Sequence, residues 1–187
     1  MTKWNVQVTE AKDIASAVAR AFYIARTGRP GPVLIDITKN AQNELIEEAE
    51  YNKCDFIRTY KPKPVLQVSQ VEAAAKLINS AKRPYLLCGQ GVLLSGATDS
   101  LVALSEKTGI PVACTLLGLG GFPADHPNYV GYLGMHGNYG PNINTNECDV
   151  LIAVGMRFDD RVTGNVSKYA RQARVVHIDI DKAEINK

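Results

Sequence analysis

Several features that would point to a particular class of protein are missing from this 187-residue sequence. No apolar run approaches the roughly 18 residues that a membrane-spanning helix needs, and the N-terminal segment MTKWNVQVTEAKD lacks the apolar core of a secretory signal. The 21 Lys and Arg nearly balance the 19 Asp and Glu, so the net charge of +2 gives no electrostatic reason to expect nucleic acid or an anionic membrane as a partner. We therefore expect a cytoplasmic protein that binds neither.

Cysteines are few and far apart. Cys54, Cys88, Cys114 and Cys148 never form a CxxC pair, and three of them stand in or beside apolar runs. Disulfide frameworks and structural zinc sites show closer, recurrent cysteine spacings. The pattern therefore predicts core thiols in a reducing compartment, and neither disulfides nor a zinc site.

Catalytic and nucleotide-binding motifs are missing as well. The sequence contains no GxGxxG fingerprint, no P-loop, and no spacing typical of a Ser-His-Asp triad or of a set of metal ligands. We interpret His126 as a turn residue, His136 as a loop residue, and His177, which lies within an apolar strand, as a satisfied core or edge residue. The sequence thus offers no candidate for a catalytic group.

What is present begins with a helix and a strand. Residues 11–26 carry apolar side chains at helical spacing: Ile14, Val18, Ala21, Phe22 and Ala25. The run VLIDI, at 33–37, is predicted to be a buried strand. Residues 40–64 have no sustained period and end in two Lys-Pro pairs, which is typical of an extended, semi-rigid linker between domains.

The remaining chain alternates apolar strands with helices. Ser69 and Glu72 form the S-x-x-E pattern that caps a helix. The apolar face of that helix would consist of Val71, Ala74, Ala75 and Ile78. Strands are predicted at 84–88, 110–115, 148–155 and 173–181, and helices at 98–108, from Pro141 onward, and at 165–172. This alternation predicts an α/β fold with a doubly wound, mostly parallel sheet.

Polar or glycine residues follow each of the four strands. Gly89, Gln90 and Gly91 follow the first strand, Thr115 the second, Gly155 the third, and Asp179 and Asp181 the fourth. Ligands of open parallel sheets bind outside the carboxyl ends of the strands. Glycine allows a phosphate to approach the backbone, and an acid about 20 residues further on can accept hydrogen bonds from ribose hydroxyls. These four strand ends together predict a binding site for a large nucleotide.

A burst of charge follows Gly155. Among the five residues from Arg157 to Arg161, the carboxylates Asp159 and Asp160 stand between two arginines. Adjacent opposite charges can hold one another in place and offset part of the cost of leaving water. The burst therefore predicts a polar part of the same site.

Five stretches together resemble one enzyme family. They are GRPGPVLIDI, IPVACTLLGLGGFPADHP, YLGMHGN, VGMRFDDRVTGN and VVHIDIDKAEINK. The sequence closely resembles the large, catalytic subunit of the acetolactate synthases, a family of thiamine-diphosphate enzymes, over essentially its whole length. This resemblance covers only the middle of the family's chain. It implies a piece of the pyrimidine-binding domain at 1–41, a linker at 42–63, and a central domain at 64–187 that binds FAD and lacks its last strand and helix.

The resemblance also implies which residues bind FAD. They are Arg29, Gly89, Gln90, Gly91, Thr115, Leu116, Leu117, Gly118, Leu133, Gly134, Met135, His136, Gly155, Met156, Arg157, Phe158, Asp159, Asp160, Arg161, Asp179 and Ile180. Asp160 and Arg161 resemble the pair near the channel to thiamine diphosphate, where herbicidal inhibitors also bind. Gln90 departs from the pattern, because the family commonly has a third glycine there. FAD has no redox role in the family's main reaction, which agrees with a sequence that shows binding features alone.

For the activity, the resemblance implies decarboxylation of pyruvate on thiamine diphosphate, followed by addition of the hydroxyethyl unit to a second pyruvate or to 2-oxobutyrate. The activating glutamate and the segment that binds Mg²⁺ and the diphosphate lie outside these 187 residues in the family, so we expect this stretch alone to be inactive. A homo-oligomer, dimer or tetramer, with a small regulatory subunit is also implied. Two alternatives stay open: a related thiamine-diphosphate carboligase or decarboxylase, and a stand-alone nucleotide-binding regulatory domain.

Overall fold

The chain divides into two compact units, Met1–Val65 and Leu66–Lys187. The computed structural model describes residues 1–47 and 51–186. Within these described residues, no helix combines the length and the apolar character needed to cross a membrane.

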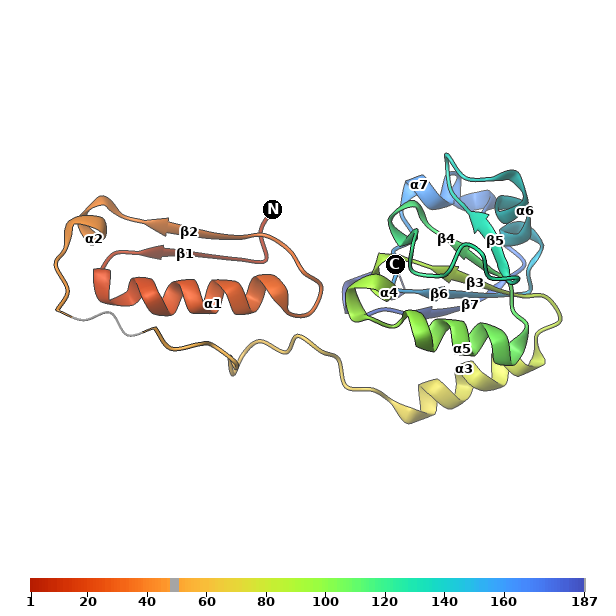
Figure 1. Cartoon of the computed structure of the whole chain (residues 1–187), viewed down its shortest axis with the longest axis horizontal. Coiled ribbons are helices and arrows are strands. Elements are labelled where there is room, and N and C mark those ends of the chain that lie inside the picture. The colour runs from red at the N-terminus through yellow and green to blue at the C-terminus, as the bar shows by residue number, and fades with distance from the viewer. Residues whose placement is uncertain (48–50, 187) are drawn as a thin grey trace. The chain divides into compact units, whose positions relative to one another are not determined.

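The first unit is a two-stranded parallel sheet with a helix beside it (Figure 1). Its elements are β1 (Trp4–Val8), a 3-10 turn (Ala11–Asp13), α1 (Ile14–Arg26), β2 (Val33–Ile37) and α2 (Lys39–Asn43). The predicted helix and strand are confirmed, whereas β1 and α2 are elements that the sequence analysis missed. Burial alternates along β2, and Leu34 is exposed, so the prediction of a buried strand is wrong. Phe22 is also exposed, because α1 buries Ala17, Ala19, Ala21 and Ile24 instead.

Part of the segment predicted to be a linker packs on this unit. The hydroxyl of Tyr60 donates to the Thr27 carbonyl at 2.9 Å, and the ring meets Tyr23 edge-on with centroids 5.9 Å apart. The ammonium of Lys3 lies 5.5 Å from the centre of the same ring. Tyr60 therefore fixes the end of this segment to the loop that follows α1.

The second unit is a five-stranded parallel sheet in the order β5-β4-β3-β6-β7. Its strands are β3 (Pro84–Cys88), β4 (Val112–Cys114), β5 (Tyr129–Tyr132), β6 (Val150–Val154) and β7 (Arg174–Ile178). Its helices are α3 (Val68–Ser80), α4 (Gln90–Ser95), α5 (Thr98–Thr108), α6 (Tyr139–Glu147) and α7 (Asp160–Thr163). Figure 1 shows α3 and α5 on one side of the sheet and α6 and α7 on the other. The predicted α/β, doubly wound architecture is confirmed.

Alternation along the central strands divides the core into two layers. Leu86 and Ile152 belong to the layer that includes residues of α3 and α5, whereas Tyr85, Leu87 and Leu151 belong to the opposite layer. The neighbours of β3 and β6 cover both of their edges, and helices cover both faces. For this reason the central strands are continuously apolar and were recognisable in the sequence.

Other details differ from the predictions. The helix expected at 165–172 is only a 3-10 turn, Val166–Lys168, because the Asn165 side chain accepts the Ser167 N–H and the backbone turns at Ala170, whose φ is 44°. Ser69 is not a cap, since α3 begins at Val68 after Gln67. Val71 and Ala75 of the predicted apolar face are exposed. Strand β5 and helices α4 and α7 were missed.

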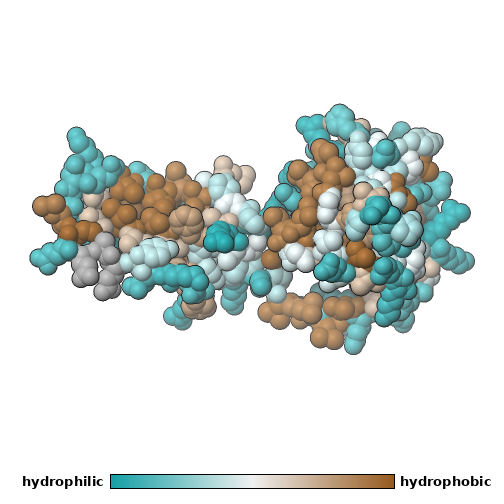
Figure 2. Space-filling view, in the orientation of Figure 1, coloured by the Kyte–Doolittle hydropathy of each residue, from teal (hydrophilic) through white to brown (hydrophobic). Residues whose placement is uncertain are grey.

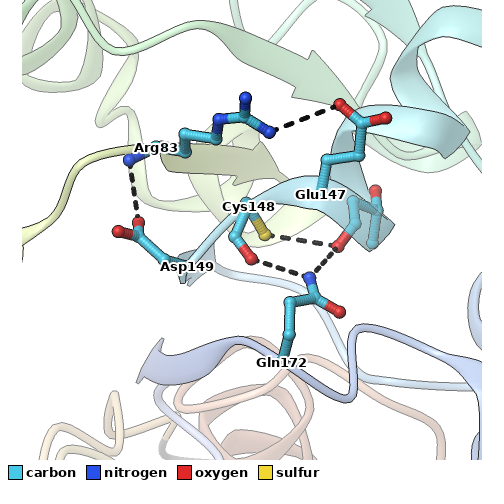
Figure 3. Close-up of polar contacts among 6 residues, drawn as sticks. Arg83, Glu147, Cys148, Asp149 and Gln172 are labelled. Carbon is cyan, nitrogen blue, oxygen red and sulfur yellow. Dashed lines mark hydrogen bonds and ion pairs between the residues drawn. The ribbon is translucent and has the colours of Figure 1, made fainter.

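At the amino edge of the sheet, polar side chains form hydrogen bonds with the backbone at the start of the strands (Figure 3). The carboxylate of Asp149 accepts the backbone N–H groups of Lys82 and Arg83 at 2.6 and 2.9 Å, and these hydrogen bonds lower the pKa of the carboxyl. The amide of Gln172 donates to the Cys148 carbonyl at 2.7 Å. These contacts join the entries of β3, β6 and β7, so this edge is used for structural connections.

Burial predicts the reactivity of the four cysteines. Cys88, Cys114 and Cys148 are buried as expected, and Cys54 is partly exposed. Burial raises the pKa of Cys148 to about 11, so roughly one part in a thousand is thiolate at about pH 8. With iodoacetamide at that pH, mass spectrometry should find Cys54 alkylated in the native chain and the other three only in urea. Native labelling of Cys148 as fast as Cys54 would contradict this packing.

Helix α7 depends on its cap. The Asp159 carboxylate accepts the Arg161 N–H at 3.1 Å, whereas the Asp160 side chain points to solvent and caps nothing. Loss of an N-cap costs about 1 kcal/mol, which corresponds to roughly five-fold faster opening of the turn. Hydrogen exchange of residues 161–164 should therefore accelerate about five-fold in Asp159→Ala and less than about two-fold in Asp160→Ala. Equal acceleration in the two variants would show that the cap does not hold this turn.

Candidate functional site

The carboxyl edge of the second sheet is where its topology separates two loops. From β3 the chain passes to β4 and β5 on one side, and then returns to form β6 and β7 on the other side of β3. The loops that follow β3 and β6 therefore leave adjacent strands toward different elements. Such a switch point is where ligands of open parallel sheets bind.

Glycines allow these two loops to touch through their backbones. A Cβ atom on Gly89 would lie 2.3 Å from the Gly155 carbonyl oxygen, and one on Gly155 would lie 2.6 Å from the Gly91 Cα. The Gly91 N–H donates to the Gly155 carbonyl at 2.8 Å, and Gly155 has a φ of 61°, which favours glycine. The space beside each glycine is filled by the other loop. The glycines thus allow contact between the loops, and the approach of a phosphate to their backbone stays a prediction.

The same holds for Gly118 after β4. A Cβ atom there would lie 2.2 Å from the Cys88 carbonyl oxygen, and the Gly118 N–H is shared between the carbonyl and the hydroxyl of Thr115. The loops after β3, β4 and β6 are therefore packed into one continuous backbone surface.

That surface presents unused hydrogen-bond donors. In the part of the chain that the structure describes, no hydrogen bond uses the backbone N–H of Gln90, Leu116, Met156 or Arg157. These four groups follow β3, β4 and β6 at the carboxyl edge. Backbone donors gathered at one place suit a ligand that carries phosphate or carbonyl oxygens.

An acid lies at the end of the neighbouring strand. The side chain of Asp179 is only 12% exposed, and its Oδ1 accepts the Asp181 N–H at 2.8 Å. Its Oδ2 lies 3.9 Å from Nε2 of His177. A carboxylate has more acceptor sites than these contacts use, so Asp179 can still accept from a ribose hydroxyl.

The charged burst after Gly155 contains one close pair and one open pair. Nε of Arg157 lies 3.0 Å from Oδ2 of Asp159. Nε of Arg161 lies 4.0 Å from Oδ2 of Asp160, and the two side chains are 70% and 82% exposed, respectively. The expectation that adjacent charges hold one another therefore applies to Arg157 and Asp159, and it is wrong for Asp160 and Arg161, which remain solvated in this chain.

Apolar side chains surround the backbone donors. Leu116, Leu117, Met135 and Ile180 are all exposed, whereas Leu133 and Met156 are buried beneath the site. Figure 2 shows apolar residues, in brown, at the surface of the second unit. An exposed apolar rim beside polar backbone groups suits a ligand that combines a flat ring with a charged tail.

The structure brings most of the predicted residues to this edge. The loop of Gly134 and Met135 is held by Asn142, whose side chain accepts the Gly134 N–H and donates to its carbonyl, and by the Met135 N–H, which donates to the Arg161 carbonyl at 2.7 Å. His136 lies in the same loop. Arg29 belongs to the first unit, so its place beside this site stays a prediction.

Two contributors were missed by the sequence analysis. Asn142 fixes the loop after β5, and Nε2 of His177 bonds the Met156 carbonyl at 2.8 Å. The ring of His177 also meets Phe158 edge-on at 5.1 Å. Nothing in the spacing of Asn142 marks it, whereas His177 was considered and interpreted only as a core or edge residue.

Comparison with known proteins places this fold among enzymes. Residues 71–187 match the family model for the central domain of thiamine pyrophosphate enzymes. Over its whole length, the chain is 46% identical to the acetolactate synthase large subunit of Corynebacterium glutamicum, of which it covers 30%. It is 48% identical to a Methanocaldococcus jannaschii protein that is also named as an acetolactate synthase large subunit, and it covers 32% of that protein.

A solved structure from Mycobacterium smegmatis, described as a thiamin diphosphate-dependent enzyme, has a similar fold. The match covers 98% of this chain and 35% of the chain in that structure, with a TM-score of 0.74 and 25% sequence identity. The chain spans about a third of the length of these relatives. It belongs to the thiamine pyrophosphate enzymes, of which residues 71–187 form the central domain.

Proposed function

We propose that the chain is the middle part of an acetolactate synthase large subunit, in which residues 64–187 bind FAD and residues 1–41 end the pyrimidine-binding domain. The observation that carries this proposal is the match of the entire chain, at 46–48% identity, to relatives with that name. The complete protein would condense two pyruvates, or pyruvate with 2-oxobutyrate, with loss of CO₂. It would work as a homo-oligomer with a small regulatory subunit.

The geometry of the carboxyl edge supports FAD as the ligand of this part. Asp179 suits the ribose, the backbone donors of Gln90, Met156 and Arg157 suit phosphate or ring oxygens, and the apolar rim suits a flavin ring. FAD would complete the packing of these loops without taking electrons. Thiamine diphosphate and Mg²⁺ would be held by other segments of the large subunit, with the exposed Asp160 and Arg161 near the path to them.

A segment exchange tests the proposed activity. Residues 66–187 would replace the matching segment of the Corynebacterium glutamicum large subunit, where the surrounding enzyme supplies everything else. We expect acetolactate formation from pyruvate within about ten-fold of the host enzyme, since this chain is 46% identical to it over 187 residues.

The control is the host enzyme carried through the same cloning with its own segment, and the 187-residue chain alone is expected to show no turnover. A hybrid that is folded and binds FAD but makes no acetolactate would contradict the proposed activity. It would then favour the alternative of a nucleotide-binding regulatory domain.

Asp179 should determine both the affinity and the choice of nucleotide. A hydrogen bond to a charged group contributes roughly 1.5–3 kcal/mol, so Asp179→Ala should weaken FAD about ten-fold to a hundred-fold in a calorimetric titration of the chain. Because a carboxylate repels a 2′-phosphate, the wild type should prefer FAD to NADP, and Asp179→Asn should reduce that preference.

The matched control is Glu106→Ala, an exposed acid near the end of α5 whose Oε1 lies 3.7 Å from Nε2 of His126. It should leave FAD affinity unchanged. The assignment of Asp179 to the ribose fails if Asp179→Ala binds FAD as tightly as the control, or if NADP binds the wild type as well as FAD.

A further inference from the structure

His177 reaches across from β7 to the loop that follows β6. Its side chain is 10% exposed, and Nε2 lies 2.8 Å from the carbonyl oxygen of Met156. A carbonyl oxygen can only accept, so His177 must carry a proton on Nε2 and donate it. The edge-on contact with Phe158 holds the ring from the same loop. This histidine therefore fastens the loop at two points.

Two successive peptide units of this loop are held by their carbonyl groups. The Gly155 carbonyl accepts the Gly91 N–H at 2.8 Å, and the Met156 carbonyl accepts from His177. In a planar trans peptide the N–H points opposite to the C=O of the same unit. The Gly155 and Met156 carbonyls are thus held toward the protein. The N–H groups of the same two peptide units, which belong to Met156 and Arg157, therefore point away from these hydrogen-bond partners.

These two N–H groups are among the four at this edge that no described residue uses. Arg157 is exposed at the carboxyl edge, and none of the described residues accepts its N–H. We propose that His177 is a positioning residue, which orients the peptide between Met156 and Arg157 so that the Arg157 N–H donates to an acceptor atom of the bound cofactor. This inference rests on the proposed function, because it takes FAD as the ligand.

A purely structural role would not require the hydrogen bond. Packing against Phe158 would be retained by any apolar side chain of similar size, whereas orientation of the peptide needs a donor at the position of Nε2. Leu removes the donor, and Gln restores one at a similar distance from the backbone. The comparison of His177→Leu with His177→Gln therefore separates the two roles.

A matched control exists within the chain. His126 is 13% exposed, contacts Phe122 edge-on, and accepts the Asn128 N–H, so it resembles His177 in burial and in aromatic contact. It precedes β5 and lies away from the carboxyl edge. His126→Leu should perturb the fold to a comparable extent without changing the binding of FAD.

The experiment is an FAD titration of the ¹⁵N-labelled 187-residue chain, observed by NMR. In the wild type we expect His177 to be protonated at Nε2, and the Arg157 amide resonance to shift on addition of FAD. His177→Leu should lose that shift and bind FAD about ten-fold more weakly. His177→Gln should keep the shift and bind within about three-fold of the wild type, as should His126→Leu.

Three outcomes would overturn the inference while the wild type still binds FAD. They are unchanged affinity in His177→Leu, equal losses in His177→Leu and His177→Gln, and an Arg157 amide that does not respond to FAD. A wild-type chain that takes up no FAD would instead overturn the proposed ligand, and the inference with it.

Discussion

The constraint on which the carboxyl edge depends is direct backbone contact between Gly89–Gly91 and Gly155. No side chain fits between these loops, since a Cβ atom on either side would overlap the opposite backbone. The contact is possible because β3 and β6 are adjacent and in register, so both loops begin at the same level of the sheet. Once the loops are locked together, their remaining N–H groups are exposed as a fixed set. Such a set of donors would suit the anionic or carbonyl-bearing ligand proposed for this edge.

The two edges of the same sheet differ in whether their backbone polar groups are hydrogen-bonded within the protein. At the amino edge, Asp149 and Gln172 satisfy the backbone groups of neighbouring connections, and little polar capacity remains for a ligand. At the carboxyl edge, several backbone donors of the glycine loops have no acceptor among the residues that the structure describes, and Asp179, a carboxylate with spare acceptor capacity, follows the neighbouring strand β7. The parallel arrangement separates an edge used for structural connections from the edge of the proposed site, where the short helices α4 and α7 begin.

The sequence predicted what depends on local pattern. Strands β3 and β6 are apolar runs, and their burial within the sheet explains why they could be recognised. Strand β7 was also predicted, although it lies at the edge of the sheet and buries only Val176. Strand β5 escaped notice because it has four residues, including Gly131 with a φ of 111°, and pairs only with β4. The hydrogen bond of His177 could not be predicted from the sequence, since its partner Met156 lies 21 positions away, after the neighbouring strand β6. The same limit applies to Asp160 and Arg161: adjacency in sequence suggested a pair, but the pairing of Arg157 with Asp159 depends on the turn into α7.

A site built from backbone groups also explains how the chain can depart from its family's pattern without losing the site. Gln90 occupies a position where the acetolactate synthases commonly have a third glycine. Its side chain is exposed and its N–H, the first of α4, remains without an acceptor among the described residues, so the group that would face a ligand is unchanged. Substitution is restricted where the loops meet, at Gly89, Gly91, Gly118 and Gly155, because a Cβ atom at any of them would overlap the backbone of a neighbouring loop. The surrounding rim can vary in its apolar side chains, because it contributes area more than direction.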